Sequence, residues 1–221
     1  MTVLPYSRSN PSPRHQQLAA YYATMHAEGH AFVTPNGEQW VTPDAAFRGR
    51  ELLTHTAEIK TLIERFGAKS ILDYGSGKGE QYASHVSVNG QTFTSPADYW
   101  GTDPVTLFEP AIPAFSVLPE GQFDGVVTTD VLEHLSRADV PWIVEEMFEK
   151  ARHFVFANVA CYPAGARLPS GENAHEIVAS GNWWNGVFET VSARYPAVSY
   201  VLLASDGYNR GGTRFVGGGR T

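Results

Sequence analysis

The stretch 70–79 constrains the fold of this chain more than any other, because an apolar run breaks there into glycines at every second position. These glycines are Gly75, Gly77 and Gly79. They allow sharp turns and a close approach of the backbone to a ligand, since no Cβ atom stands in the way. Residues 71–72 have the character of the end of a buried strand, and residues 80–84 can open a helix whose N-terminal amides face the same ligand. We therefore predict a cofactor loop, with an ordinary strand-to-helix turn as the alternative.

Asp73, two residues before the first glycine, indicates the type of cofactor. The dinucleotide fingerprint is G-x-G-x-x-G, whereas this loop runs D-x-G-x-G-x-G. A carboxylate there would lie close to the pyrophosphate of a dinucleotide, but it suits the cationic amino-acid end of S-adenosylmethionine. The pattern resembles motif I of the class I S-adenosylmethionine-dependent methyltransferases. The resemblance implies that Asp73, Tyr74, Gly75 and Gly77 bind this cofactor.

A second motif follows at Glu109-Pro110, at the end of a predicted strand over 105–108. In dinucleotide folds and in methyltransferases, an acid at the end of the second strand accepts hydrogen bonds from the ribose hydroxyls. We assign this role to Glu109 and place Pro110 in the same cofactor site. The spacing of 30 residues from Gly79 exceeds the usual ~20, because of an insertion at 84–103.

A third motif lies at 117–135. The phrase L-P-x-G-x-F-D-G-V-V resembles the methyltransferase segment that flanks the adenine, which implies that Val117 and Leu118 pack on the base. The segment T-D-V-L-E-H-L that follows resembles the motif after the fourth strand of the same superfamily. The resemblance therefore also implies that Asp130 belongs to the cofactor site. The three motifs come in the family's order over about 65 residues.

The hydrophobic pattern of the whole chain agrees with an α/β fold. Apolar stripes at helical spacing alternate with short apolar runs typical of strands. The helical stripes lie at 18–25, 52–66, 140–151 and 183–191, and the strands at 69–72, 105–108, 125–129, 153–157, 198–203 and 213–216. With the resemblance, we predict a Rossmann-like, doubly wound, mostly parallel seven-stranded sheet with an N-terminal helical extension, in a single domain over 1–221.

Several segments allow two interpretations. Residues 1–13 are rich in Ser, Pro and Asn and are predicted to be a mobile arm. Residues 14–47 supply a helix and either a lid over the cofactor or an element packed on the sheet edge. The pair at 183–184, two tryptophans, is either core or a shelf for substrate, and the pair at 99–100 is a candidate partner or substrate surface.

Charge and composition exclude some classes of protein. A formal charge of −7, with four lysines and scattered arginines, argues against a broad basic face for nucleic acid. The single cysteine, Cys161, excludes an internal disulfide and a cysteine-rich zinc module. No apolar leader and no run of about 18 apolar residues occur in the sequence, so we expect a cytoplasmic protein without a membrane partner.

The residues most able to carry chemistry follow the predicted strand at 125–129. Asp130, Glu133 and His134 stand at i, i+3 and i+4, so they can share one side of a first helical turn. The loop after the next parallel strand opens on the same sheet edge and contains His175. Two carboxylates and two imidazoles form a mixed set suited to Mg, Mn, Fe or Zn.

This D-x-x-E-H with a later histidine is similar to the E-x-x-E-H and distant His with which small-RNA 2′-O-methyltransferases hold a divalent metal, and ubiquinone-pathway O-methyltransferases have a related motif. The sequence departs from that pattern at Asp130, whose side chain is one methylene shorter. In metal-free members of the superfamily, L-E-H supplies a histidine that lines the substrate pocket and an acid that caps the helix. Both interpretations stay open.

We take His134, with Glu133 beside it, as the candidate catalytic pair. A neutral imidazole can accept the proton of a hydroxyl group as its oxygen attacks the methyl group. The predicted function is S-adenosylmethionine-dependent methylation of an oxygen on a small-molecule or sugar-like acceptor. The alternatives are terminal ribose 2′-O-methylation of RNA and a non-catalytic cofactor-binding protein that regulates a partner.

Overall fold

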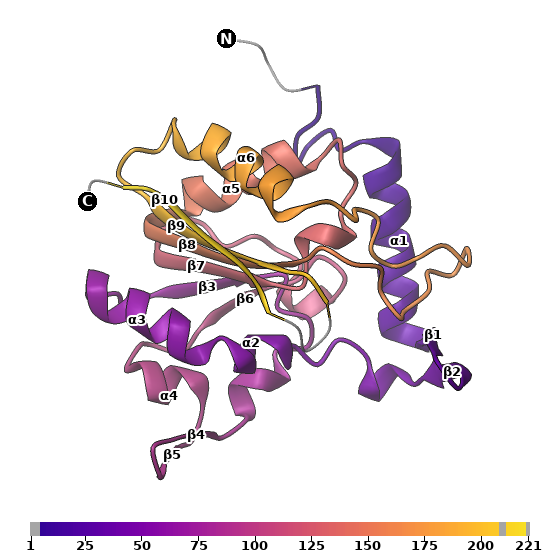
Figure 1. Ribbon diagram of the computed structural model, residues 1–221, viewed down its shortest axis with the longest axis horizontal. Helices are drawn as coiled ribbons and strands as arrows, with labels where there is room; N and C mark the ends of the chain where they lie inside the picture. The colour runs from indigo at the N-terminus through magenta and orange to yellow at the C-terminus, as the bar shows by residue number, and fades with distance from the viewer. Residues whose placement is uncertain (1–4, 208–210, 220–221) are drawn as a thin grey trace.

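A computed structural model describes residues 5–207 and 211–219 of the chain. Six strands form the central sheet in the order β10-β9-β8-β7-β3-β6 (Figure 1). All neighbouring strands are parallel except the antiparallel pair β9 and β10. The strands are β3 (Ile71–Tyr74), β6 (Thr106–Phe108), β7 (Phe123–Thr129), β8 (Ala151–Ala160), β9 (Ser199–Ser205) and β10 (Gly212–Gly218). The α/β class and the mostly parallel sheet agree with the prediction from sequence.

The sheet has six strands among the described residues, where the resemblance implied seven. Strand β6 is the edge, and the connection that follows it, 109–122, contains only a 3-10 turn at Pro113–Phe115. Prolines at 110, 113 and 119 interrupt this connection. Because proline has no N–H group to donate to a neighbouring strand, the segment cannot extend the sheet beyond β6.

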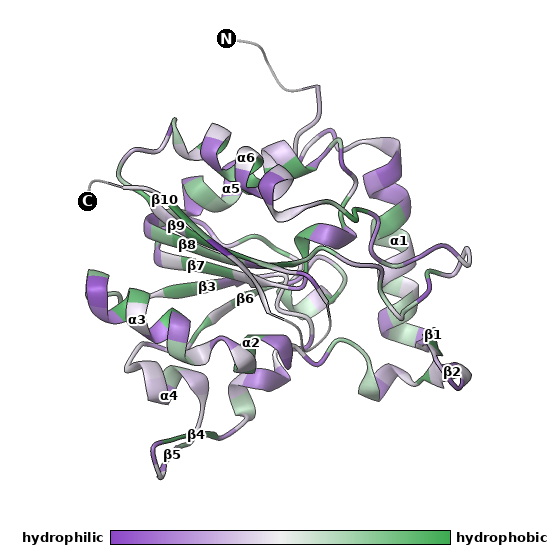
Figure 2. Cartoon of the chain, in the orientation of Figure 1, coloured by the Kyte–Doolittle hydropathy of each residue, from purple (hydrophilic) through white to green (hydrophobic). Residues whose placement is uncertain are grey.

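Helices cover both faces of the sheet (Figure 1). On one face, α2 (Glu51–Thr54), α3 (Thr56–Phe66) and α4 (Pro96–Trp100) enclose a core that includes Ile59, Ile71 and Phe154. On the other face, α5 (Val140–Lys150) and α6 (Gly181–Ser192) enclose a larger one around Val144 and Trp184. Figure 2 shows the hydrophobic residues concentrated along the strands between these two layers.

The helix predicted at 52–66 forms as two helices, α2 and α3. Gly67 explains where α3 ends. The apolar stripe of α3 is buried, and Gly67 follows in the left-handed region at φ 63. Its amide closes the helix by donating to the carbonyl of Glu64, which is the usual role of glycine at a helix C-terminus. Helix α5 begins after Asp139, whose carboxylate makes no capping hydrogen bond to α5.

The insertion predicted at 84–103 folds into small elements of its own. The hairpin β4 (Val86–Val88) and β5 (Gln91–Phe93) turns at Asn89 and Gly90, both at positive φ. The pair Tyr99 and Trp100 in α4 is buried, and the indole of Trp100 donates to the Thr56 carbonyl at 2.9 Å. The prediction that this pair forms a partner or substrate surface was therefore wrong, because the two rings fill the core between α3 and α4.

The N-terminal part of the chain lies at the carboxyl end of the sheet and against α5. Helix α1 (Pro13–Glu28) precedes the hairpin β1 (His30–Thr34) and β2 (Gly37–Val41), followed by a 3-10 turn at Pro43–Ala45. Residue Ser12 caps α1, and its N–H group donates to Asp139 at 3.0 Å. The guanidinium of Arg8 binds Glu146 of α5. Residues 1–4 of the predicted arm lie outside the described residues.

Candidate functional site

The order of the strands defines where a ligand would bind. Strand β3 has β6 on one side and β7 on the other. The chain leaves β3 toward the α4 face and leaves β7 toward the α5 face. In open α/β sheets, ligands bind outside the carboxyl ends of the strands at such a switch point. The glycine loop, Glu109 and the segment 130–134 all follow strands that end at this edge.

The glycine loop turns as its sequence predicts, but its contacts are with the protein itself. Gly75, Gly77 and Gly79 have φ values of 88, 55 and 71. The amides of Gly75 and Lys78 donate to the carbonyls of Phe108 and Phe47 at 2.8 and 3.0 Å. The expected ligand-facing helix after the loop is only a 3-10 turn at Glu80–Ala83, because the chain leaves directly for the β4–β5 hairpin.

The space next to the loop explains why glycines are needed there. A Cβ atom on Gly75 would come within 2.5 Å of the Val131 side chain, and one on Gly77 within 2.5 Å of the Phe47 carbonyl oxygen. Phe47 itself is a non-glycine residue at φ 50. The segment 43–49 therefore lies across the loop, and a ligand that approaches Gly77 closely requires this segment to move.

Asp73 is buried behind the loop. Its Oδ2 accepts hydrogen bonds from Gln81 Nε2 at 3.1 Å and from the Tyr82 hydroxyl at 2.9 Å. Burial raises the pKa of Asp73 to about 7, against the opposing effect of these two hydrogen bonds. Asp73 Oδ1 and Gln81 Oε1 are buried oxygens without a hydrogen-bond partner among the described residues. Two acceptors thus lack donors beside the glycine loop.

Glu109 lies beside the glycine loop. Its Oε2 accepts from the Gly77 amide at 3.2 Å, and its Oε1 accepts from the Ala111 amide at 3.0 Å. Burial raises the pKa of Glu109, while the two backbone amides lower it. These amides orient the carboxylate beside the glycine loop and leave lone pairs on both oxygens for further donors.

The other residues predicted to bind the cofactor differ in their exposure and in the elements that they contact. The Val117 side chain is 81% exposed and Pro110 is exposed, whereas Leu118 packs against the core. Tyr74 is buried, and its hydroxyl donates to Glu146 of α5 at 2.6 Å. The Tyr74 ring thus faces the α5 layer rather than the crevice.

The residues after β7 converge with the loop after β8. Asp130, His134 and His175 each offer one ligand atom, and these atoms all lie within 4.8 Å of one another. The His134 and His175 ring centroids are 4.8 Å apart, and His175 Nε2 is 3.9 Å from Asp130 Oδ1. Asp130 has φ 58, a backbone strain of about 1–3 kcal/mol for a non-glycine residue, which occurs most often at functional sites.

Both histidines have one ring nitrogen engaged with a backbone carbonyl. His134 Nδ1 is 2.9 Å from the Ala174 oxygen, and His175 Nδ1 is 2.5 Å from the Tyr162 oxygen. Because a carbonyl can only accept, each Nδ1 carries the proton and each Nε2 keeps its lone pair. Metal-binding histidines are typically held in this way. Two ligands of one zinc ion lie at most about 4.4 Å apart, so small side-chain rotations would bring the three into range.

Glu133 lies in the interior, apart from this group. It is fully buried, its Oε1 accepts from the Ala160 amide, and its Oε2 has no partner among the described residues. Burial, followed by repulsion from Asp130, raises the pKa of Glu133 well above its usual value. Both effects favour the neutral form of the carboxyl, and the converging ligand atoms are those of Asp130, His134 and His175.

Tyr22 is a site residue that the sequence analysis missed. Its hydroxyl oxygen is 2.7 Å from His134 Nδ1 and 2.9 Å from the Ala174 oxygen. Burial raises the pKa of Tyr22 well above 10, and nearby carboxylates, first Asp130, raise it further. The helical stripe of α1 marks Tyr22 as inward-facing, but only the fold reveals what it faces.

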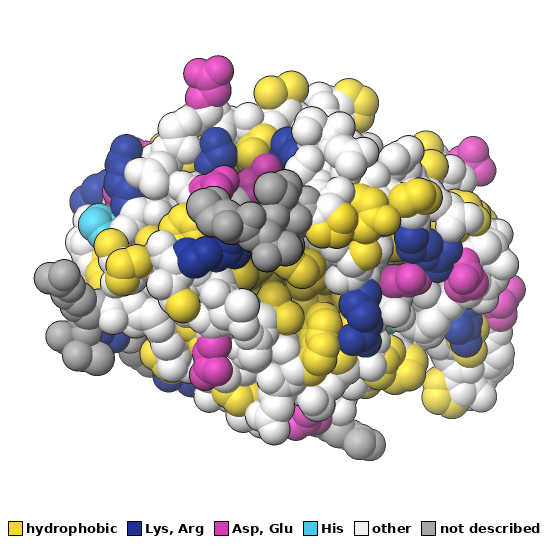
Figure 3. Space-filling view, turned by 90° about the horizontal axis from the view of Figure 1, so that it is seen from above, with side chains coloured by type: hydrophobic (Ala, Val, Ile, Leu, Met, Phe, Trp, Pro, Cys, Tyr) yellow, Lys and Arg dark blue, Asp and Glu magenta, His cyan; other side chains and the backbone are white. Residues whose placement is uncertain are grey.

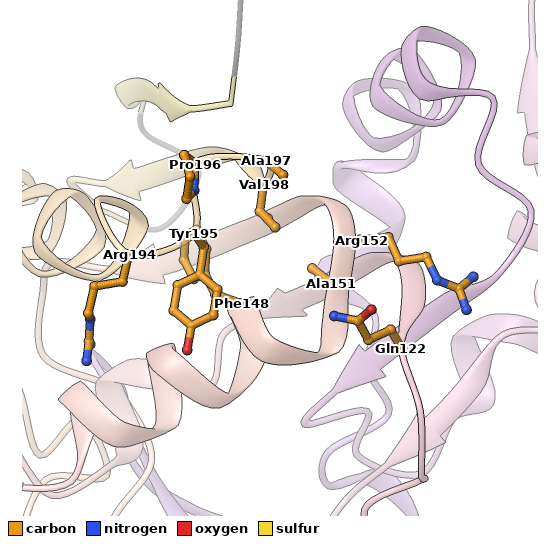
Figure 4. A pocket seen from close by; sticks show the side chains of 9 residues that line it. All are labelled: Gln122, Phe148, Ala151, Arg152, Arg194, Tyr195, Pro196, Ala197 and Val198. Atoms are coloured by element: carbon orange, nitrogen blue, oxygen red, sulfur yellow. The ribbon is translucent and has the colours of Figure 1, made fainter.

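A separate pocket opens at the opposite edge of the sheet (Figure 4). It is lined by residues at the starts of β8 and β9 and by the end of α5, including Phe148, Ala151 and Val198. The arginines at its rim are paired, Arg152 with Asp124 at 3.2 Å and Arg194 with Glu145 at 2.5 Å. Both charged side chains that line this pocket are thus paired, and the pocket lies away from the switch point.

No protein-family model, no curated protein sequence and no solved structure matches this chain. Within residues 5–207 and 211–219, no helix combines the length and apolar character that crossing a bilayer requires.

Proposed function

We propose that this chain is an S-adenosylmethionine-dependent methyltransferase that acts on an oxygen of a small or sugar-like acceptor. One observation carries the proposal. A glycine loop with Glu109 on one side of the switch point faces Asp130, His134 and His175 on the other. A candidate cofactor loop and a set of groups able to act on a hydroxyl thus lie at the same carboxyl ends of the strands, where open α/β sheets bind ligands.

The residues beside the glycine loop fit the chemistry of the cofactor. Glu109 has lone pairs left for two ribose hydroxyls. Asp73 Oδ1 and Gln81 Oε1 lack donors, and an ammonium group supplies donors of that kind. Exposed Val117 offers an apolar surface at the position where the resemblance implies the adenine. When bound, the cofactor supplies a methyl group on a positively charged sulfur.

His134 supplies the proton acceptor in this proposal. Its Nε2 takes the proton of the acceptor hydroxyl, the hydroxyl oxygen forms the new bond to the methyl carbon, and the carbon–sulfur bond breaks with its electrons left on sulfur. In a second form of the mechanism, Asp130, His134 and His175 would hold a divalent metal ion, with His134 binding through this same Nε2, and the positive charge of the ion, in place of proton acceptance by His134, would favour loss of the hydroxyl proton to solvent. Most of the rate enhancement comes from holding the acceptor oxygen in line with the methyl group.

The charges at the carboxyl ends of the strands support a neutral acceptor over RNA. Asp73, Glu109 and Asp130 lie at the ends of β3, β6 and β7. Figure 3 shows Lys and Arg side chains scattered among acidic ones on the face seen there, without a broad basic area. Mass spectrometry after incubation with methyl-labelled S-adenosylmethionine and a cell extract tests this. Label on a small molecule supports the proposal, whereas label lost with ribonuclease treatment favours RNA, and no transfer alongside tight binding favours a regulatory protein.

Replacing Glu109 by alanine should weaken binding of S-adenosylhomocysteine about 10- to 150-fold, because hydrogen bonds to a charged acceptor contribute about 1.5–3 kcal/mol. Isothermal titration calorimetry measures this. Glu120→Ala, at an exposed glutamate of the same connection, should bind like the wild type. Tight NADH binding without any response to S-adenosylhomocysteine would overturn the cofactor assignment.

Binding of S-adenosylhomocysteine should weaken about 10-fold from pH 8 to pH 6, because the pKa of Asp73 is about 7 and a cationic group requires the ionised carboxylate. Below the pKa, the protonated carboxyl must lose its proton before it can bind the cation, so affinity falls as pH falls. Calorimetry across this range gives the slope. Asp73→Asn should abolish the pH dependence, and an equally steep slope in that variant would contradict the role of Asp73.

A further inference from the structure

The side chain of Tyr22 connects helix α1 to the candidate site. Tyr22 lies with its ring 5.3 Å from that of His134, in an edge-on arrangement, and 5.8 Å from that of Phe47. Its hydroxyl meets His134 Nδ1 and the Ala174 carbonyl at 2.7 and 2.9 Å. Since His134 Nδ1 is itself 2.9 Å from the same carbonyl, the three atoms form a closed triangle.

Two oxygen atoms in this triangle can accept the Nδ1 proton of His134, the Tyr22 hydroxyl and the Ala174 carbonyl. The Ala174 carbonyl can only accept, so it receives the hydroxyl proton of Tyr22. His134 Nδ1–H then has the Tyr22 oxygen as its nearest acceptor at 2.7 Å, beside the carbonyl at 2.9 Å. If the hydroxyl instead donated to Nδ1, two lone pairs would face each other across 2.9 Å, those of Nδ1 and of the carbonyl. The favoured arrangement leaves the lone pair of His134 on Nε2.

A second side chain of α1, that of Arg14, contacts the loop after β8. The guanidinium of Arg14 forms ion pairs with Glu172 at 3.1 Å and with Glu176 at 2.6 Å. These glutamates flank Ala174 and His175 in the loop after β8. Helix α1 therefore fixes both the His134 ring and the loop that carries the other histidine.

The geometry points to Tyr22 as a positioning residue of the candidate site, which holds His134 in the form with Nε2 free. The inference deepens the proposed function, since it concerns how His134 is prepared for proton acceptance or metal binding. The hydrogen bond of the hydroxyl group carries the role, and the aromatic ring supplies packing. A residue of α1 thereby becomes part of a site otherwise built from the ends of β7 and β8.

The variant Tyr22→Phe separates the hydroxyl from the ring. Tyr21→Phe is a matched control, because Tyr21 is the same residue type in the same helix and its hydroxyl accepts a hydrogen bond from Gln17 of α1 at 3.0 Å. Both variants should unfold at temperatures close to that of the wild type. If Tyr22 served only to pack, the two variants would behave alike in every other measurement.

Long-range proton–nitrogen NMR spectra of the metal-free protein report which ring nitrogen of His134 carries the proton, with His134→Asn used to assign its signals. The wild type and Tyr21→Phe should show Nδ1–H, and Tyr22→Phe should show a shift toward a mixture of the two forms, because the Ala174 carbonyl is then the one remaining acceptor of this triangle for the Nδ1 proton. This readout needs neither cofactor nor acceptor. An unchanged His134 spectrum in Tyr22→Phe would overturn the inference, whatever the methyltransferase assay gives.

Titration of the same proteins with Mn²⁺ alone gives a second readout. Loss of a group that orients a ligand typically costs 10–100-fold in metal affinity, so Tyr22→Phe should bind Mn²⁺ at least about 10-fold more weakly than Tyr21→Phe. If the wild type does not bind Mn²⁺ but the NMR shift occurs, the positioning role stands and the metal part of the proposed function fails. Equal Mn²⁺ affinity in both variants, with equal spectra, overturns the inference and leaves the proposed function untouched.

Discussion

Replacing His134 by alanine should lower methyl transfer about 10²–10⁴-fold, the usual contribution of a general base, while S-adenosylhomocysteine binding stays within a few-fold of the wild type. The reason is its position, since the His134 ring lies 4.8 Å from that of His175, whereas Glu109 and Asp73 lie beside the glycine loop. Transfer of label from methyl-labelled S-adenosylmethionine measures the loss. His85→Ala, at an exposed histidine, should be harmless.

The variant His175→Ala, combined with chelation, separates the two forms of the mechanism. If Asp130, His134 and His175 hold an ion, EDTA should abolish transfer, Mn²⁺ or Mg²⁺ should restore it, and both alanine variants should be similarly damaging because each removes a ligand. If His134 acts alone, chelation should change nothing and His175→Ala should be milder. Full activity in His134→Ala would contradict both forms.

The sequence was sufficient for those parts of the fold that local patterns specify. Each strand of the central sheet and helices α3, α5 and α6 lie within a few residues of the predicted ranges, because periodicity reports which side chains are buried. The seventh strand came from the resemblance alone, and the prolines after β6 explain why the connection after β6 does not extend the sheet. In the insertion, Tyr99 and Trp100 were misread because nothing local tells an aromatic core residue from an exposed one.

The sequence indicated which residues belong to the candidate site better than it indicated how their side chains are arranged. Topology alone brings His175 to His134, since parallel neighbouring strands end at one edge. Tyr22 was missed because it is 112 residues from His134 in sequence. The coverage of the glycine loop by Phe47 is likewise a long-range contact that spacing cannot encode. Glu133, which the motif grouped with its neighbours, has its carboxyl turned to the Ala160 amide instead.

Replacing Glu133 by alanine should destabilise the protein by about 2–4 kcal/mol, because the Ala160 amide is left buried without an acceptor and the lost side chain leaves a cavity. For a chain of this size, the melting temperature should fall by about 4–16 °C. Glu133→Gln should fold normally at pH 7, since it keeps the acceptor oxygen and matches the neutral acid in shape. Thermal unfolding of the three proteins measures the effect.

The pH dependence of Glu133→Gln gives the sharper test. Because the folded pKa of Glu133 is raised by burial and by Asp130, the folded protein binds more protons than the unfolded chain above the ordinary pKa of a glutamate. Wild-type stability should therefore fall as pH rises, by up to about 1.4 kcal/mol per unit relative to Glu133→Gln. A stability difference that stays constant from pH 5 to pH 8 would contradict the buried neutral carboxyl. In that case Glu133 would be ionised, and a loss of Mn²⁺ affinity in Glu133→Gln would then restore it as a ligand beside Asp130.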